Sequence, residues 1–173
     1  MIDLMLRRRT VRRFTDKPVS PEQIERLLQA GLLAPSSLNK HPVRLFVVTD
    51  PATISAMVDC KHAGTMALKT ATLVIIVAAD SQISDVWIED AAIAATHILL
   101  EAEALGLGCN WIHLRNRKTN TGESSAEWIR RQLSIPETLQ PSVLLCFGNK
   151  AVSPEPYTLE SLQWEHVSGF PEK

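Results

Sequence analysis

The strongest constraint on the fold is a long apolar segment over residues 87–105. As a helix it would be about 28 Å long, at 1.5 Å per residue, and apolar side chains would cover nearly all of its circumference. In a chain of 173 residues, such a helix must lie at the centre of the protein, at a subunit interface, or at both. Four acidic residues and one histidine interrupt the segment and exclude a membrane span: Glu89, Asp90, His97, Glu101 and Glu103.

A second apolar run, residues 73–79, is rich in β-branched side chains and predicts a strand buried on both faces. A helix is expected from Pro21, because Ser20 and Gln23 form a capping box, and Ser124 with Glu127 predicts a second box. The other expected elements are helices over 3–9, 51–60 and 124–135 and strands over 45–48, 109–112 and 142–147.

Strands and helices alternate along the chain, but their connections differ in length and no strand is followed by a glycine-rich turn. This pattern favours an α+β fold, with a central mixed β-sheet flanked by helices, over a doubly wound parallel sheet. No internal repeat or linker divides the sequence, so we expect a single domain over residues 1–173. Its proline-punctuated end, about 153–173, is expected to form an arm that packs on another part of the structure.

The composition excludes several classes of protein. A net charge of −1 and 45% hydrophobic residues argue against a disordered chain and against wholesale binding of nucleic acid or membrane surfaces. Three widely spaced cysteines indicate reduced, buried thiols. No signal peptide is recognised at the N-terminus, so we expect a cytoplasmic protein. The five histidines lack ligand spacing, and no metal site is expected.

Five of the eleven arginines lie within residues 7–13. Without these five positive charges, the rest of the chain carries a formal charge of −6. A protein that binds polyanions in general would be basic elsewhere too, so the cluster indicates binding of a specific anion. Arg8, Arg9 and Arg12 can offer bidentate donors to phosphate oxygens, and the Thr10 hydroxyl can join them. A polar turn follows at residues 34–39, and together the two segments indicate a nucleotide-like ligand.

The usual catalytic motifs are missing from this sequence. It contains no H-E-x-x-H, C-x-x-C, G-x-S-x-G, Walker A or G-x-G-x-x-G pattern. A bound phosphate must therefore be held by arginine side chains, and the chemistry must come from a cofactor.

Four segments in the same order resemble the flavin-dependent nitroreductase family. Residues 8–12, Arg-Arg-Thr-Val-Arg, resemble the family's Arg-Arg-Ser-x-Arg phosphate motif, and residues 34–42 resemble its Ala-Pro-Ser-x-x-Asn-x-Gln-Pro loop. Residues 90–112 are similar to its long helix and following strand. Residues 162–167 resemble the tail of its shorter members. The resemblance covers nearly the whole chain.

The resemblance implies an intertwined homodimer that binds FMN at the subunit interface and uses NAD(P)H as reductant. Hydride would pass by a ping-pong scheme to a small-molecule acceptor, namely a nitroaromatic compound, a quinone or a related molecule. The implied phosphate motif comprises Arg8, Arg9, Thr10 and Arg12. The partner chain would line the flavin ring with Pro35, Ser36, Ser37 and Asn39, and the backbone of Ile112, His113 and Leu114 would approach its reactive edge.

Two departures from the family pattern concern the substrate pocket and the phosphate site. His41 and Val43 stand where the family usually has Gln and Trp, which alters the expected pocket wall. Longer members have a C-terminal Lys-x-Arg that completes the phosphate site. Here Lys150 is the remaining candidate, and Arg115 or Arg117 could substitute for it.

Other functions stay open at this point. A flavin-binding family member could serve desaturation, dehalogenation or sensing, and the basic N-terminus could be an arm that binds nucleic acid. Aromatic residues make up only 5% of the chain, which disfavours base stacking. We see no second charged cluster that would select an anionic substrate, so modest selectivity is expected. A charged residue at Ala95 is expected to disrupt the subunit interface.

Overall fold

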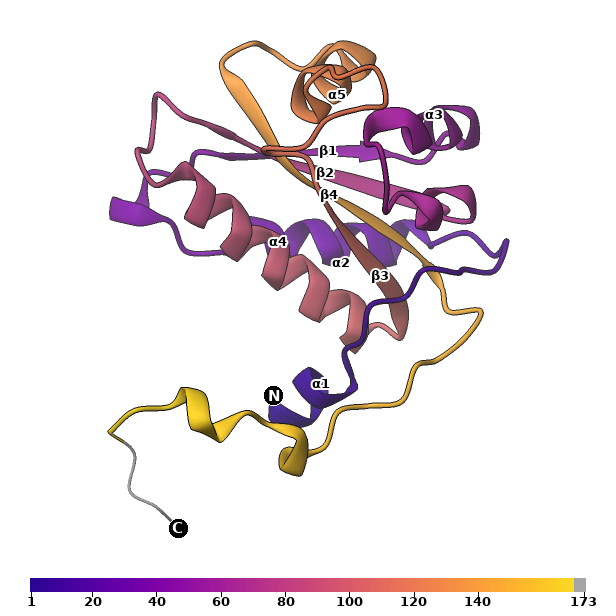
Figure 1. Cartoon of the computed structure of the whole chain (residues 1–173), viewed down its shortest axis with the longest axis vertical. Helices are drawn as coiled ribbons and strands as arrows, with labels where there is room; N and C mark the ends of the chain where they lie inside the picture. The colour runs from indigo at the N-terminus through magenta and orange to yellow at the C-terminus, as the bar shows by residue number, and fades with distance from the viewer. Residues whose placement is uncertain (170–173) are drawn as a thin grey trace.

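A computed structural model describes residues 1–169. Its centre is a four-stranded sheet in the order β1-β2-β4-β3, with helices on both faces (Figure 1). All three strand pairings are antiparallel. The α+β class is confirmed, with one difference: among the described residues, parallel pairing is limited to an isolated bridge between Thr10 and Cys109. The strands are β1 (Val43–Val48), β2 (Leu73–Asp80), β3 (Leu107–His113) and β4 (Leu139–Asn149).

Helices form a layer on each side of the sheet. Helices α2 (Pro21–Leu32) and α4 (Trp87–Ala104) cover one face, and α3 (Pro51–Ala56) and α5 (Ser125–Leu133) cover the other (Figure 1). Helix α1 (Ile2–Arg7) lies outside the two layers and contacts α4 (Figure 1). Short 3-10 turns complete the chain at Ser37–Asn39, Met57–Cys60, Met66–Lys69, Leu159–Ser161 and Trp164–His166.

Strand β2 runs through the middle of both cores. Its alternate side chains point in opposite directions, as the pleat requires. Val74, Ile76 and Ala78 join the core under α3 and α5, whereas Leu73, Ile75, Val77 and Ala79 join the core under α2 and α4. The prediction of a strand buried on both faces is confirmed.

The two predicted capping boxes have different outcomes. The box at Ser20 is present, with the Ser20 side chain accepting from the Gln23 amide and the Gln23 side chain accepting from the Ser20 amide. The box at Ser124 was wrong, because the Ser124 side chain makes no capping hydrogen bond. The Glu127 carboxylate is instead paired with Arg130, and the Ser124 backbone forms a bridge with Lys118.

Helix α4 is central, and its small side chains allow it to lie close to the sheet. Ala91, Ala94, Ala95 and Ala102 have no exposed surface, whereas Ile93 on the opposite side is 38% exposed. The expectation that a charge at Ala95 would test the interface was therefore wrong, because Ala95 lies inside the chain's own core. No helix in the described range is long and apolar enough to cross a membrane.

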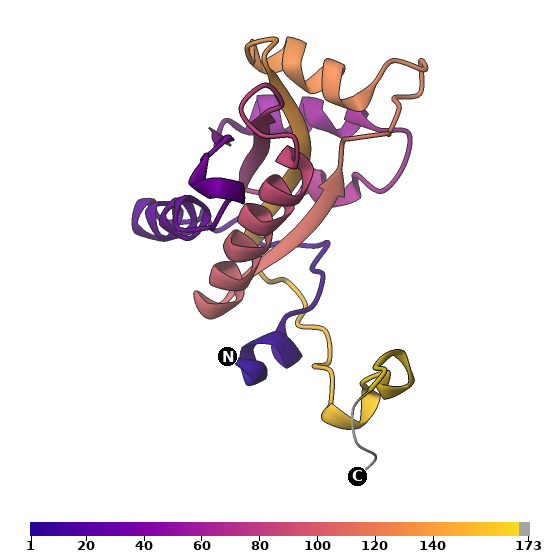
Figure 2. The same cartoon turned by 90° about the vertical axis from the view of Figure 1, so that its left-hand side faces the viewer.

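The N-terminal segment and the start of the C-terminal arm lie side by side, away from the sheet (Figures 1 and 2). The Tyr157 amide donates to the Leu6 carbonyl at 2.9 Å, and the Arg9 guanidinium lies 4.3 Å from the centre of the Tyr157 ring. Arg9 also donates to the Glu155 carbonyl. The expected C-terminal arm is thus held on α1 and the arginine segment. The last four residues of the arm, 170–173, lie outside the described residues.

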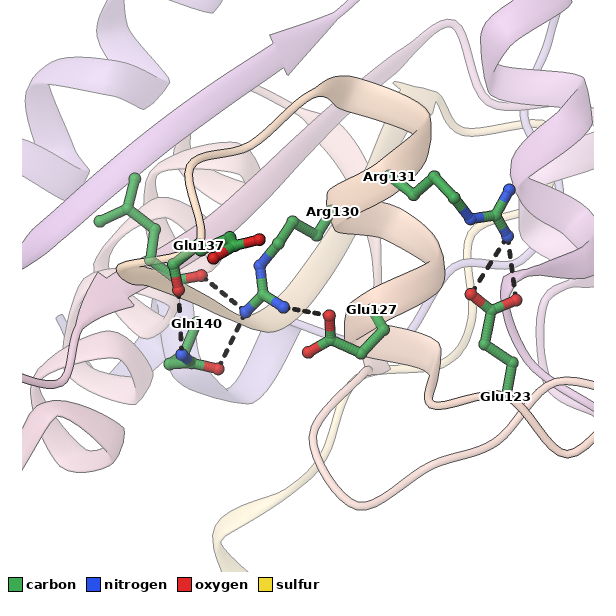
Figure 3. A network of polar contacts seen from close by, with 7 residues as sticks. Glu123, Glu127, Arg130, Arg131, Glu137 and Gln140 are labelled. Carbon is green, nitrogen blue, oxygen red and sulfur yellow. Dashed lines mark hydrogen bonds and ion pairs between the residues drawn. The ribbon is translucent and has the colours of Figure 1, made fainter.

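A polar network ties α5 to the start of β4 (Figure 3). The Arg130 guanidinium donates to the Leu139 carbonyl and to the Gln140 side chain, at 3.0 Å each, and pairs with Glu127. The neighbouring Arg131 instead reaches Glu123 with two hydrogen bonds, at 2.9 and 3.1 Å. The side chain of Arg130 is 11% exposed and that of Arg131 is 59% exposed.

We predict that Arg130→Gln lowers the free energy of unfolding by about 1–3 kcal/mol, because hydrogen bonds in a largely buried setting are lost. Arg131→Gln is the matched control and should cost less than about 1 kcal/mol, as expected for an exposed ion pair. Urea denaturation of both variants measures the difference. Equal losses would contradict a special structural role for Arg130.

Candidate functional site

The arginine segment lies along the free edge of β3. Thr10 forms a bridge with Cys109, and the Val11 amide donates to the Cys109 carbonyl at 3.0 Å. Two glycines permit this close approach. A Cβ on Gly108 would lie 2.8 Å from Val11, and one on Gly148 would lie 2.6 Å from the Phe14 side chain, both too short for real atoms. The sheet therefore places Arg8 and Arg12 near the start of β3.

The four residues of the predicted phosphate motif differ in their surroundings. Within residues 1–169, neither Arg8 nor Arg12 takes part in an ion pair, and Arg12 is exposed. Arg9 is engaged by the arm through Glu155 and Tyr157. Arg8 and Arg12 thus lie on either side of Thr10 in the sequence with no carboxylate partner among residues 1–169, whereas the contacts of Arg9 hold the arm.

The other predicted flavin-facing segment lies at the opposite end of β3. Ile112 and Leu114 are buried in the core, so only their backbone could reach a ligand. His113 is exposed and borders a cavity of about 250 Å³. Its lining comes from α4, β3, β4 and the loop after β3: Ile88, Ala92, Trp111, His113, Arg115, Asn116, Arg117, Ser142 and Val143.

The imidazole of His113 is held by its neighbour on the same face of β3. The Trp111 Nε1–H donates to His113 Nδ1 at 3.3 Å, with the two rings edge to face. Desolvation, followed by the positive charges of Arg117 and Lys61, lowers the pKa of His113 from its ordinary value. The lowered pKa favours the neutral ring, and because Nδ1 accepts from Trp111, the neutral ring carries its proton on Nε2 in this arrangement.

The polar loop between α2 and β1 is fastened to the first turn of α4. The buried Asp90 carboxylate accepts from the Ser37 amide at 2.9 Å and from the Ser84 hydroxyl at 2.8 Å. The Ser36 hydroxyl accepts from the His41 amide at 2.9 Å. These bonds hold three residues with positive φ, namely Leu38, Asn39 and His41.

A second cavity of about 250 Å³ lies behind this loop. Its wall includes the predicted loop residues Pro35 and Ser36 and both predicted pocket residues, His41 and Val43. Ser37 and Asn39 belong to the same loop without lining this cavity. Asp90 and Ala94 form its wall on α4.

The two cavities lie on opposite flanks of α4. Asp90 borders the loop cavity and Ala92 borders the His113 cavity, and these positions are about 160° apart around a helix with 3.6 residues per turn. One chain therefore brings the arginine segment and residues 112–115 to the same strand, but it does not bring the loop of residues 35–39 to them.

Lys150 is already paired in this structure. Its ammonium lies 2.7 Å from the Glu103 carboxylate, and both side chains are largely buried. Ser84 and Glu103 were not recognised from the sequence as partners of Asp90 and Lys150. No local signal could have indicated them, because hydroxyl and carboxylate residues at such separations have no characteristic spacing.

We predict that Asp90→Asn loosens the loop of residues 35–41, because an amide offers one acceptor where the carboxylate offers two. Losing a buried partner costs about 1–3 kcal/mol, so hydrogen exchange at the Ser37 amide should accelerate. Glu89→Gln is the matched control, because Glu89 is adjacent and exposed. Unchanged exchange in Asp90→Asn would show that the carboxylate does not hold the loop.

Comparisons with known proteins agree with this architecture. A protein from Archaeoglobus fulgidus, named as an NADH dehydrogenase/NAD(P)H nitroreductase, is 34% identical over 80% of this chain and 78% of its own. A protein of the same name from Methanothermobacter thermautotrophicus is 31% identical over 89% and 79%. The solved FMN-dependent nitroreductase from Clostridium difficile superposes with a TM-score of 0.94, at 34% identity, over 96% of this chain and 97% of that one. The family description "Nitroreductase family" matches residues 5–64 and 59–149. The chain belongs to the nitroreductase family.

Proposed function

We propose that the protein is an FMN-dependent NAD(P)H oxidoreductase that reduces nitroaromatic compounds, quinones or related acceptors. The names of related proteins support FMN as the cofactor. The Clostridium difficile neighbour is named an FMN-dependent nitroreductase, and a neighbour from Desulfovibrio desulfuricans was solved in complex with FMN. A relative from Vibrio harveyi, 30% identical over 89% of this chain, is named an NADPH-flavin oxidoreductase.

The observation that carries the proposal is the arrangement along β3. Arg8 and Arg12 lie by Cys109, and the His113 cavity lies four residues further on, about 13 Å away at 3.3 Å per residue. If the phosphate of the cofactor binds at Arg8 and Arg12, the rest of the cofactor would extend along the edge of β3 toward the His113 cavity. The apolar wall of Ile88 and Val143 then suits a flat ring.

Bound FMN supplies the two-electron transfer, with NAD(P)H and the acceptor occupying the same place in turn. The protein's own residues bind and orient. Arg8, Thr10 and Arg12 would hold the phosphate, and the backbone of residues 112–114 would approach the ring. The His113 Nε2–H offers a neutral donor at the end of β3. Lys150 stays a candidate to complete the phosphate site, although its pairing with Glu103 compensates its charge. Arg115, the other candidate from the sequence, lies at the opposite end of β3 from Arg8 and Arg12, beside the His113 cavity.

The proposed site is completed by a second copy of the chain. The loop of residues 35–39 lies on the wrong flank of α4 to reach the same chain's His113 cavity. Between the two flanks, α4 presents Ile93 with 38% of its surface exposed. A two-fold partner packed on this face would bring its own loop toward the His113 cavity, which makes the homodimer the functional unit.

We predict that the purified protein holds non-covalent FMN and that Arg12→Ala weakens its binding by about 1.5–3 kcal/mol, through loss of a charge-assisted phosphate contact. Arg13→Ala is the matched control, because Arg13 is also exposed and lies outside the motif. Mass spectrometry of the released flavin and fluorescence titration of the apoprotein decide the matter. Recovery of FAD, or equal affinities in the two variants, would refute the assignment.

We predict that Ile93→Glu shifts the protein toward monomer and lowers its FMN content together, since the site is shared between subunits. Gln132→Glu, an equal change of charge at an exposed position on α5, should leave both unchanged. Light scattering combined with flavin absorbance measures both quantities. A stable Ile93→Glu monomer with full FMN would rule out the shared site.

A further inference from the structure

The loop that follows β3 carries two arginines without acidic partners. Arg115 and Arg117 both border the His113 cavity, and within residues 1–169 neither takes part in an ion pair. Three other arginines of the chain are paired with carboxylates: Arg26, Arg130 and Arg131. No acidic residue lines the cavity. The cavity therefore combines an apolar wall with a cationic edge.

The backbone that presents these arginines is firmly held. The amides of Leu114 and Arg115 both donate to the Ser142 carbonyl, at 3.0 and 3.3 Å. The Arg117 amide donates to the Leu114 carbonyl, and its carbonyl accepts from the Ser125 amide at 2.9 Å. A left-handed residue, Asn116 with φ 56°, closes the turn between the two arginines. Because these bonds order the backbone of the turn, they fix the positions from which the side chains of Arg115 and Arg117 extend.

A third cation adds to the same potential. Lys61, which is distant in sequence, lies close enough that its charge, like that of Arg117, disfavours protonation of His113. The sequence showed no second charged cluster able to select an anionic substrate. The structure differs on this point, because the fold places Arg115 and Arg117 at the edge of one cavity, and the charge of Lys61 reaches His113 in its wall.

We propose that Arg115 and Arg117 select flat aromatic electron acceptors that carry a carboxylate over neutral acceptors of the same shape. The inference rests on the proposed function, because it places the acceptor at the end of β3. Ile88, Ala92 and Val143 would contact the ring, and the guanidinium groups would receive the carboxylate. The ordered turn holds both arginines at the edge of the same cavity as this apolar wall.

The position of the cavity argues against the reductant as the source of the anion. The 2′-phosphate of NADPH lies on the adenosine half, at the far end of the molecule from the nicotinamide ring that gives up the hydride. An anion bound beside the reactive edge therefore belongs to the acceptor. The preference for NADPH or NADH should not depend on this turn.

The test compares 4-nitrobenzoate with 4-nitrobenzamide, which have nearly the same shape and differ in charge. We expect the flavin-loaded protein to favour the carboxylate, both in kcat/KM and in equilibrium binding measured by calorimetry. In Arg115→Gln/Arg117→Gln the ratio of the two substrates should fall roughly fivefold, the upper range for exposed ion pairs. Lys17→Gln/Lys69→Gln, the same change of charge at exposed positions outside the cavity, should keep the ratio.

The outcomes separate this inference from the proposed function. Absence of FMN, or of NAD(P)H oxidation with any acceptor, refutes the proposed function, while the binding ratio still tests the anion preference. An unchanged ratio in the arginine variant overturns the inference. So does a loss of FMN affinity with the ratio preserved, which would assign the arginines to the cofactor phosphate. A change in the NADPH to NADH ratio would assign them to the reductant.

Discussion

The packing of α4 on the sheet is the contact on which the other parts of the molecule depend. Its alanine face lies against β2 and β4, and only small side chains allow the helix so close. The position of the helix then fixes its two flanks. One flank fastens the loop of residues 35–41 through Asp90, and the other forms a wall of the His113 cavity. The core and the proposed site therefore share one element.

Much of the fold could be predicted from the sequence because its signals are local. The run of β-branched residues in β2 and the box at Ser20 need only neighbouring side chains, and both were identified correctly. The box at Ser124 failed because Arg130, one helical turn after Glu127, competes for the carboxylate. The side of α4 that faces away from the sheet could not be predicted either. Apolar residues surround the helix, so the sequence does not show which of them pack on the sheet.

The candidate site was harder to predict because it is built from contacts between distant residues. The motifs pointed to the arginine segment and the loop, which stay a prediction as a site, yet Asp90 and Ser37 are 53 positions apart and Arg9 meets the arm 146 positions away. The cavity that Arg115 and Arg117 border likewise exists only once α4, β3 and β4 are packed together. The spacing of residues in a sequence indicates contacts within one helix or strand, whereas these contacts join different elements.

The way Asp90 fastens the loop has a consequence for how this family can diversify. The carboxylate binds the backbone amide of Ser37, so the bond does not depend on which side chains the loop carries. The side chains at His41 and Val43 can therefore differ from the residues that the family pattern predicts without breaking this bond. Because the anchor binds backbone, side-chain changes in the loop can alter acceptor specificity while the loop keeps its position. Such changes cost the fold little stability.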